Sequence, residues 1–576
     1  MSSATQPHKL SYFKGQNEPE LLNLCVGQVL DRSAEMFPNR PALVVRHQNV
    51  RFTYAQLRAE AERVARGLMA LGIQKGGRIG AWATNNAEWV LLQFATAKVG
   101  AILVNLNLRY RAHELKYALQ QSECEAMFLI RGFRDCDYVE TLFAIAPESR
   151  GSRPGQFDSR SLPHLKNVVF IGQDTPSPFH CWDDFLRNGE CVTEKQLRER
   201  ESTLEPHDPI NIQYTSGTTG FPKGATLSHH SIVNNGMLIG NAMKMTEKDS
   251  ICIPVPFYHC FGMVLGNMNC VVAGAAMVIP AEYFDPLATL QAVHEERCTA
   301  LHGVPTMFIA ELAQERFKEF DLSCLRTGIM AGSSCPIELM RRVTDEMHCS
   351  ELTIAYGLTE CSPVITQTST DDPLELRVTS VGRALPHTEV KIVDPHSGQT
   401  LPIGSHGELC ARGYMVMNGY YNDEKGTAET IDAEGWCHTG DVAVVDESGY
   451  FRITGRIKEM IIRGGENIYP REIEEFLHQC PGIADAHVIG IPDARLGEDV
   501  MAWVKLKDGA ELTEEQIRRF CKGKIADFKI PRHLKFVDTF PMTVTGKIQK
   551  FVMRDISVKE MGLEHLAGSQ RITGHP

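Results

Sequence analysis

The chain has 576 residues and a net charge of −12; 43% of its residues are hydrophobic and 23% are charged. This length predicts more than one domain of an ordinary globular protein, and the acidic balance argues against general nucleic-acid binding. The 17 cysteines include no C-x-x-C pair. They fit a reducing compartment better than a disulfide framework, and no Cys/His cluster has the spacing of a zinc site.

The N-terminus lacks the apolar core of a secretory signal and is too poor in basic residues for a mitochondrial presequence. We therefore expect the chain in the cytoplasm, with the mitochondrial matrix as the alternative if the chain is a processed form. The longest apolar run, roughly Gly262–Ala281, contains Asn267 and Asn269 and is interrupted by glycines. This run predicts buried strand and helix rather than a membrane span.

Short apolar runs alternate with longer amphipathic runs between Arg40 and Asn107. The expected order is strand, helix, strand, helix, strand, over Ala42–Val45, Thr53–Gly72, Ile79–Trp82, Glu88–Lys98 and Gly100–Val104. Strands that alternate with helices of this length imply βαβ units and a mostly parallel sheet. The polar stretch Ser149–Pro163 predicts a surface loop.

A strand-like lead-in, with Ile210, Ile212 and Tyr214, enters a loop rich in glycine and hydroxyl residues. Glycine lets backbone N–H groups converge on an anion, hydroxyls add donors, and lysine adds positive charge. The expected ligand is a polyphosphate, held by Thr215, Ser216, Gly217, Thr218, Thr219, Gly220, Phe221, Pro222 and Lys223. The loop does not have the Walker A pattern; the alternative is a flexible linker, whose composition is similar.

This loop resembles the phosphate loop of the adenylate-forming (AMP-binding) superfamily, which includes acyl-CoA synthetases, aryl-CoA ligases, peptide-synthetase adenylation domains and luciferases. The resemblance extends over nearly the whole chain. It is greatest for medium-chain ligases of the acyl-CoA synthetase family member 2 type, through the stretches HDPINIQYTSGTTG, LSHHSIVNN, IRGGENIYP and FKIPRHLKFV. Their mitochondrial members begin with a presequence that is not found here.

After the loop the alternation continues, with helices expected over Ser228–Met243 and Leu287–Arg297 and a strand over Ala276–Ile279. From Val390 to Ile453 short alternating runs between turns predict an antiparallel sheet or a small barrel. Beyond it, Pro470 opens a helix and Thr513 with Gln516 forms the capping box of another. The tail after Arg554 is polar, and we expect it to be loosely ordered.

The expected fold is therefore α/β. Residues 1–457 would form a large N-terminal domain of mostly parallel αβ sheets plus a small β-barrel, with the acid and ATP sites. Residues 458–576 would form a small mobile α+β C-terminal lid domain, as the resemblance implies.

The motif Tyr356-Gly357-Leu358-Thr359-Glu360 resembles the family's Y-G-x-T-E. The resemblance implies that Tyr356 stacks on the adenine, Thr359 contacts the α-phosphate and Glu360 holds Mg²⁺, which suits a hard carboxylate. Upstream, Gly332 and Ser333 resemble the segment that lines the adenine. A strand end with a turn glycine would show the same residues without any such role.

Two motifs near the C-terminus complete the nucleotide site by resemblance. Thr439-Gly440-Asp441 resembles the T-G-D motif, so Asp441 would bind the ribose hydroxyls, Arg456 would add a ribose or phosphate contact, and Lys458 would be the hinge of the small domain. Pro541–Ile548 resembles P-x-T-x-T-G-K-I, so Lys547 would bind the carboxylate and α-phosphate during adenylation. The alternative for Lys547 is a solvated surface residue.

Two further stretches concern the other substrates. His259, in the stretch Pro256–Met263, resembles the residue between ATP and the acyl tunnel, where it would orient the carboxylate or gate the pocket. An apolar channel, or equally a core, would be formed by Phe257, Phe261, Met263, Val264 and Met268. Gly464 and Gly465 would line the tunnel for the pantetheine arm of CoA, or form a hairpin turn.

The sequence thus predicts an ATP-dependent, AMP-forming ligase that joins a medium- to long-chain fatty acid to coenzyme A. Its substrates would be the acid, ATP and CoA, with Mg²⁺ as cofactor; we expect no nucleic acid and no membrane span, and a homodimer is compatible with the sequence. Rival readings are an aryl- or cinnamoyl-CoA ligase, a stand-alone enzyme that loads a carrier protein, a luciferase-like oxygenase, and a nucleotide-binding pseudo-enzyme. Loss of Lys547 or Glu360 would have favoured the pseudo-enzyme, and both are present.

Overall fold

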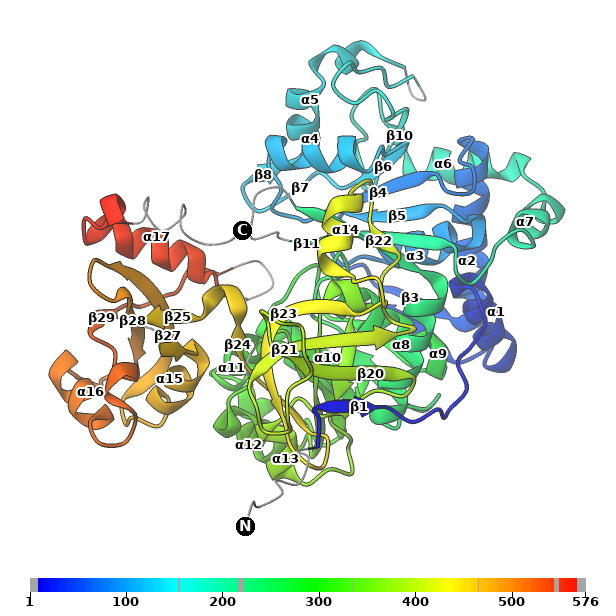
Figure 1. Cartoon of the computed structure of the whole chain (residues 1–576). Coiled ribbons are helices and arrows are strands. Elements are labelled where there is room, and N and C mark those ends of the chain that lie inside the picture. Colours follow the sequence, from blue (N-terminus) through cyan, green and yellow to red (C-terminus); the bar gives the residue numbers. More distant parts are fainter. Residues whose placement is uncertain are drawn as a thin grey trace. The chain divides into compact units, whose positions relative to one another are not determined.

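The computed structural model describes residues 9–153, 156–215, 222–333, 335–464, 466–542 and 548–566. The chain divides into two compact units (Figure 1). The larger consists of Phe13–Val390 and Ala411–His438, and the smaller of the described residues of Met1–Tyr12, Lys391–Cys410 and Thr439–Pro576. The domain boundary between residues 457 and 458 stays a prediction.

One sheet of the larger unit contains the strand that leads to the predicted nucleotide loop. Its order is β10 (His180–Cys181), β9 (Asn167–Phe170), β6 (Ala126–Leu129), β4 (Arg78–Trp82), β5 (Ile102–Asn105), β11 (Pro209–Thr215), β12 (Lys223–Ser228) and β22 (Gly419–Tyr420). The strands from β10 to β11 pair in parallel, and β11, β12 and β22 pair antiparallel.

The second sheet of this unit has nine strands. Their order is β19 (Arg383–Ala384), β18 (Val364–Gln367), β17 (Glu351–Gly357), β16 (Thr327–Ala331), β15 (Ala300–Gly303), β13 (Ser250–Cys252), β14 (Ala276–Ile279), β2 (Pro41–Val45) and β3 (Val50–Thr53). The interior strands, from β17 to β2, are parallel. The prediction of βαβ units in a mostly parallel sheet is confirmed.

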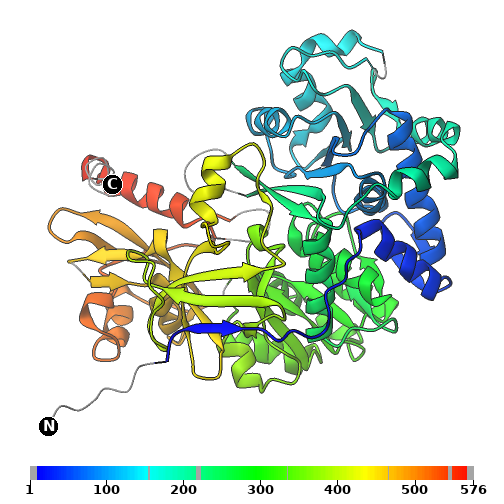
Figure 2. The ribbon, with the colours of Figure 1, turned by 45° about the vertical axis from the view of Figure 1, so that its right-hand side comes forward.

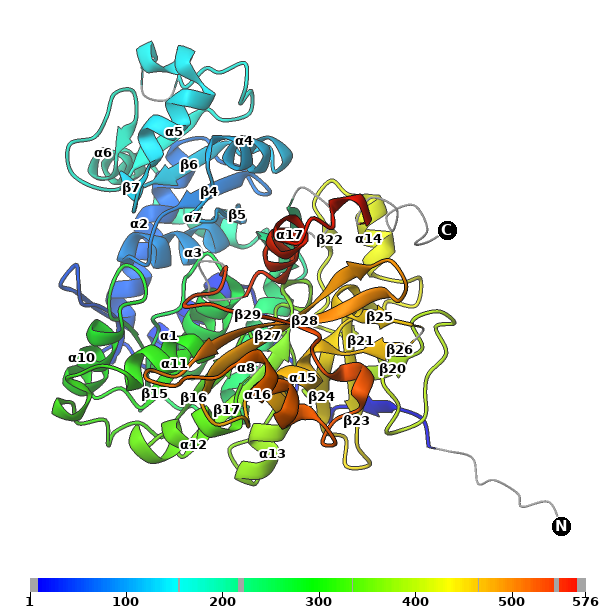
Figure 3. The same ribbon diagram turned by 90° about the vertical axis from the view of Figure 1, so that its left-hand side faces the viewer.

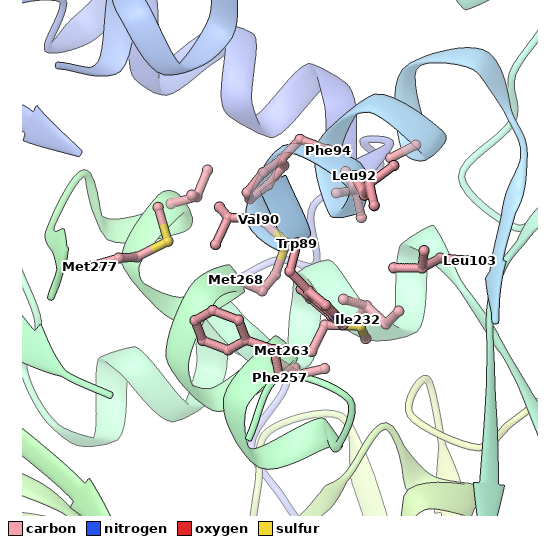
Figure 4. Packing of buried hydrophobic residues seen from close by; sticks show 14 of the residues in the cluster. Trp89, Val90, Leu92, Phe94, Leu103, Ile232, Phe257, Met263, Met268 and Met277 are labelled. Carbon is pink, nitrogen blue, oxygen red and sulfur yellow. The ribbon is translucent and has the colours of Figure 1, made fainter. Parts of the chain in front are cut away.

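Helices α2 (Tyr54–Ala70) and α3 (Ala87–Val99) explain how local sequence places the core. Thr53 caps α2 in a capping box with Gln56, as the Ser/Thr-to-Gln spacing favours. Helix α3 is buried nearly all round, and its Trp89 ring lies 5.3 Å from the ring of Phe257. Figure 4 shows Trp89 and Phe94 of this helix among buried methionines from other segments.

The apolar run near Gly262–Ala281 is buried, as expected. It forms a π-helix over Phe261–Met268, then α9 (Asn269–Ala273) and β14. No described helix has the length and apolar character needed to cross a membrane. The π-helix was not predicted; such helices are rare and concentrate at functional sites.

Four strands between Thr388 and Arg456 join the N-terminal strand β1 in a five-stranded sheet. Its order is β1 (Tyr12–Lys14), β20 (Thr388–Val393), β21 (Gly407–Gly413), β23 (Cys437–Val445) and β24 (Phe451–Arg456). Figure 2 shows β1, in blue, running beside the later strands. The chain passes from one unit to the other within β1, β20, β21 and β23. The prediction of an antiparallel sheet is confirmed for β23 and β24, which pair antiparallel.

The C-terminal part of the smaller unit is an α+β fold (Figure 3). Its sheet has the order β26 (Glu466–Ile468), β25 (Ile461–Arg463), β28 (Gly497–Leu506) and β27 (Ile483–Asp493), with β29 (His533–Phe536) paired to β28. Helix α15 (Pro470–Leu477) begins at Pro470, and Thr513 caps α16 (Glu514–Cys521), both as predicted.

The expectation of a loosely ordered tail after Arg554 is wrong for part of that tail. Helix α17 spans Lys550–Glu560, and its Met553 is fully buried. Ser557 accepts a hydrogen bond from the indole N–H of Trp503 at 3.0 Å. Asp555, Lys559 and Glu560 of this helix are exposed, while its buried side packs with β27.

The stretch Ser149–Pro163 is not a simple surface loop. It begins within a 3₁₀ turn, Pro147–Gly151, and it buries Phe157 and Leu162. Two apolar residues among many polar ones anchor the stretch.

Candidate functional site

The predicted nucleotide loop joins two neighbouring antiparallel strands. Thr215, the last residue of β11, pairs with Lys223, the first residue of β12. The strand-like lead-in is thus confirmed, and the hairpin brings the threonine and the lysine together at the ends of the loop. Ser216–Phe221 lie outside the described residues, so the loop's contact with phosphates stays a prediction.

Glu360 lies in the larger unit, in a turn after β17, and its residue is 8% exposed. Its Oε1 accepts a hydrogen bond from the Tyr420 hydroxyl at 2.7 Å and a longer one from Thr215 Oγ1 at 3.4 Å. The Glu360 carbonyl accepts from the N–H of Met417 at 2.8 Å. The structure therefore brings two sequence-predicted residues, 145 positions apart, to one point.

Tyr420 connects this carboxylate to the lysine of the loop. The Lys223 Nζ lies 4.9 Å from the centroid of the Tyr420 ring, within the range of a cation–π contact. Burial, reinforced by the nearby charge of Glu360, raises the pKa of Tyr420 far above its ordinary value. The phenol therefore remains a proton donor to Glu360. Sequence reasoning missed Tyr420, because a tyrosine on a two-residue strand belongs to no motif.

The residues predicted around the adenine share one edge of the nine-stranded sheet. Strands β16 and β17 are parallel neighbours, and Ala331 pairs with Ala355. Gly332 and Ser333 therefore follow one strand where Tyr356 and Gly357 end the next, and Thr359 begins the turn beyond. Ligands bind at this carboxyl edge in open α/β sheets.

Gly332 and Gly357 each meet a local requirement for glycine. Gly332 has a φ of +90°, which side chains disfavour. At Gly357 a Cβ would collide with the carbonyl of Pro363. These glycines make the turns that end both strands at this edge.

His259 immediately precedes the segment that winds into the π-helix. Its Nδ1 accepts a hydrogen bond from the N–H of Phe261 at 3.2 Å, and its carbonyl accepts from the N–H of Met263 at 3.1 Å. Because Nδ1 is an acceptor, the proton of the neutral imidazole is on Nε2. The contact of His259 with the acid stays a prediction.

The residues predicted to line an apolar channel are packed in the main core, the alternative left open by the sequence. Figure 4 shows Phe257, Met263 and Met268 packed near Trp89. Each residue of the set is at most 7% exposed: Phe257, Phe261, Met263, Val264 and Met268. A channel along them stays a prediction.

In the smaller unit, Asp441 and Arg456 face each other across the β23–β24 hairpin. The Arg456 Nε lies 2.9 Å from Asp441 Oδ1, and the side chains are 58% and 8% exposed. The structure brings these two predicted residues together, with an exposed guanidinium beside a mostly buried carboxylate. Lys458 is exposed in the 3₁₀ turn Ile457–Glu459, which follows β24.

Gly464 lies in the turn between β25 and β26, with a φ of +60°. This is the hairpin geometry that the sequence offered as the alternative to a CoA tunnel. Gly465 lies outside the described residues. The role of both glycines toward CoA stays a prediction.

Lys547 also lies outside the described residues, but the segment around it is anchored at both ends. Met542 bridges to Ile548, and the N–H of Gln549 donates to the carbonyl of Pro541 at 2.8 Å. Just beyond, Lys550 lies 2.7 Å from the carboxylate of Glu474. The described residues on either side of Lys547, Met542 and Ile548, therefore lie next to each other.

The chain matches the sequence profile described as AMP-binding enzyme over residues 30–421, and that of the AMP-binding enzyme C-terminal domain over residues 472–547. It is 50% identical over 544 residues to YngI of Bacillus subtilis strain 168, which carries the name of an acyl-CoA synthetase; the match covers 94% of this chain and 99% of that protein. It is 45% identical over 550 residues to the mitochondrial medium-chain acyl-CoA ligase ACSF2 of Rattus norvegicus, covering 95% and 89%.

Solved structures agree with these relatives. The anthranilate CoA ligase AuaEII in complex with anthranoyl-AMP superimposes with a TM-score of 0.83 at 26% identity, covering 94% of this chain and 98% of that one. ATP-bound MatB from Rhodopseudomonas palustris gives 0.77 at 28% identity, covering 94% and 100%. The chain belongs to the AMP-binding enzyme family, as an AMP-forming acid–thiol ligase of the acyl-CoA synthetase type.

Proposed function

We propose that this enzyme joins medium- to long-chain fatty acids to coenzyme A through an acyl-adenylate, with release of AMP and pyrophosphate. The observation that carries the proposal is the convergence of Glu360, Thr215 and Tyr420, with Lys223 over the tyrosine ring. A carboxylate, hydroxyls and a cation at one point suit a nucleotide with its metal ion. The name of the ACSF2 relatives favours a medium-chain acid.

In the first step an oxygen of the acid attacks the α-phosphorus of ATP, and pyrophosphate leaves. Residues of the loop from Thr215 to Lys223 would hold the phosphates, Tyr356 and Gly332 the adenine, and His259 the acid. In the second step the CoA sulfur attacks the acyl carbonyl, its proton is lost, and AMP leaves. The enzyme needs no nucleophile of its own, so positioning and charge neutralisation supply the catalysis.

Magnesium fits the oxygen donors that meet at Glu360. The carboxylate is 8% exposed and receives two hydroxyl hydrogen bonds, so its orientation is fixed. Hard oxygen ligands of this kind are those that Mg²⁺ prefers. Bound there, the ion would neutralise phosphate charge.

The second half-reaction would use the C-terminal domain, residues 458–576, in another orientation. Lys458 would be the hinge, Lys547 would leave the nucleotide, and Gly464 and Gly465 would approach the pantetheine arm. The exposed position of Lys458 directly after β24 supports its role as the hinge.

A chain-length screen tests the proposed substrate. Straight-chain acids from two to eighteen carbons are mixed with ATP, CoA and the enzyme, and AMP and ADP are measured separately. We expect AMP to form, fastest with medium- to long-chain acids. Faster turnover of benzoate, anthranilate or cinnamate would instead support an aryl-CoA ligase, which the similarity to AuaEII keeps as the second candidate.

Asp441→Ala is expected to raise the ATP KM about tenfold or more and to change the KM of the acid much less. The substitution removes the predicted acceptor for the ribose hydroxyls and leaves Arg456 without its carboxylate partner; charged hydrogen bonds contribute about 1.5–3 kcal/mol. Initial rates at varied ATP and at varied acid measure the two effects. Arg383→Ala, at another exposed arginine beside an aspartate, is the control; an unchanged ATP KM in Asp441→Ala would remove the ribose role.

A further inference from the structure

The strand that leads to the nucleotide loop carries polar residues where a buried strand is usually apolar. Strand β11 lies inside its sheet between β5 and β12, yet Asn211 and Gln213 are 1% and 2% exposed. Alternation along a strand places both on the same face as Thr215. Burying amide side chains is unfavourable unless they are hydrogen-bonded. The hydrogen-bond partners of Asn211 and Gln213 therefore indicate why these polar residues are buried here.

Gln213 connects β11 to the segment that contains His259. Its Oε1 accepts a hydrogen bond from the thiol of Cys260 at 3.0 Å, and its Nε2 donates to the sulfur of Met263 at 3.7 Å. Cys260 adjoins His259, and Met263 donates its N–H to the His259 carbonyl. One side chain thus spans from the strand of the nucleotide loop to both ends of the turn that holds the imidazole.

Asn105 supports this connection from the neighbouring strand. It lies directly opposite Gln213 in the β5–β11 register. Its Nδ2 lies 3.1 Å from the carbonyl of Tyr258 and 3.8 Å from the Met263 sulfur. Asn211 in turn donates to Asn105 Oδ1 at 2.9 Å. We call Asn105, Gln213, Cys260 and Met263 the amide bridge.

The opposite side of the π-helix is held as well. Gln93 of α3 donates to the carbonyl of Met263 at 3.1 Å, and Asn267 donates to Gln93 Oε1 at 2.9 Å. The sulfur of Met263 is therefore held by Gln213 and Asn105, and its carbonyl is held by Gln93 of α3. The π-helix has little freedom to shift unless β11 shifts with it.

We propose that Gln213 is a positioning residue through which nucleotide binding and acid binding reinforce each other. This inference rests on the proposed function, because His259 is taken to lie at the acid. When ATP binds beside Thr215, the end of β11 is fixed, and the amide bridge transmits that order to Cys260 and His259. An acid that orders His259 strengthens ATP binding by the same factor, because binding linkage is reciprocal.

The test measures this coupling directly by calorimetry. Decanoate is titrated into the full chain without nucleotide and with saturating Mg²⁺ and α,β-methylene-ATP, which cannot be cleaved where adenylation breaks ATP. The ratio of the two Kd values is the coupling factor. In the wild type we expect about tenfold tighter binding with the nucleotide, within the usual range of such couplings.

Cys260→Ala and Cys260→Ser form a matched pair. Alanine removes the donor to Gln213 Oε1, whereas serine keeps a donor at nearly the same place. We expect the coupling factor to fall to about two or less in Cys260→Ala and in Gln213→Leu, and to remain within about twofold of the wild type in Cys260→Ser. If the substitutions acted only through lost packing, the melting temperature of every variant would fall. The coupling factor would then not differ between Cys260→Ala and Cys260→Ser.

Each outcome decides the matter. A wild type without coupling, or Cys260→Ala and Gln213→Leu variants that keep it, would overturn the role of Gln213. If Gln213→Leu fails to fold, the coupling factors of Cys260→Ala and Cys260→Ser still test the role of Gln213, because each of these substitutions changes only the sulfur atom. A wild type that binds no decanoate and releases no AMP with any acid would instead refute the proposed function.

Discussion

Lys547→Ala is expected to slow acyl-adenylate formation by about 10²-fold or more, the usual cost of losing one preorganised charge at a transition state. Negative charge builds on the α-phosphate as the acid attacks it, and by resemblance Lys547 is the cation delivered there. The second half-reaction breaks the bond to AMP in the other domain orientation, so it should be largely spared. Pyrophosphate exchange measures the first step, and CoA consumption from supplied decanoyl-AMP measures the second.

Lys559→Ala is the matched control, because Lys559 is an exposed lysine on α17 in the same C-terminal region. It should change neither half-reaction by more than about twofold, since surface substitutions usually have small effects. Equal losses in both half-reactions of Lys547→Ala would contradict the model of two domain orientations.

The elements of the larger unit could be predicted because their causes are local. Thr53 and Gln56 form the capping box that starts α2, and apolar residues at helical spacing bury one side of it. The apolar residues Ile210, Ile212 and Tyr214, at alternate positions before Thr215, predict strand β11 in the same local way. Pairing order could not be predicted in this way, because neighbours such as β14 and β2 are separated by more than two hundred residues.

The site shows where sequence reasoning reaches its limit. Motif residues such as Glu360 could be named, but their shared partner Tyr420 could not, because the contact joins positions 60 residues apart. The π-helix at Phe261–Met268 is contacted at Met263 by amide side chains from β5, β11 and α3, and no periodicity in that run reveals these contacts. Helix α17 was missed since only a narrow apolar stripe marks it.

The sequence also leaves the preferred acyl chain length of the acid undetermined. Each methylene group in an apolar pocket contributes roughly 1 kcal/mol, so a small change in pocket depth shifts the preferred chain length. Phe257 and Met268 illustrate the difficulty, because their patterns are equally typical of a core and of a channel wall. The chain-length screen is therefore more informative than further inspection of motifs.

Glu360→Gln is expected to reduce adenylation by about 10²- to 10³-fold and to raise the Mg²⁺ concentration needed for half-maximal rate. Glutamine has nearly the same shape and keeps an oxygen that can accept from Tyr420 and Thr215. It lacks the negative charge that a divalent cation requires of its ligand. The lower adenylation rate should therefore result from weaker Mg²⁺ binding rather than from a change in the surrounding fold. Pyrophosphate exchange at varied Mg²⁺ concentrations measures this effect.

Tyr420→Phe distinguishes loss of the metal-binding charge from loss of the hydrogen bonds around Glu360. It removes the hydroxyl that donates to Glu360 at 2.7 Å, while the carboxylate remains. A neutral hydrogen bond contributes only about 1 kcal/mol, or somewhat more to a charged partner, so the rate should fall about tenfold and higher Mg²⁺ should restore part of it. If instead the adenylation rates of Glu360→Gln and Tyr420→Phe fell by the same factor and neither rate rose with added Mg²⁺, Glu360 would act by holding Thr215 and Tyr420 together. The metal role would then have to be assigned to another residue, because the charge would not be what the reaction uses.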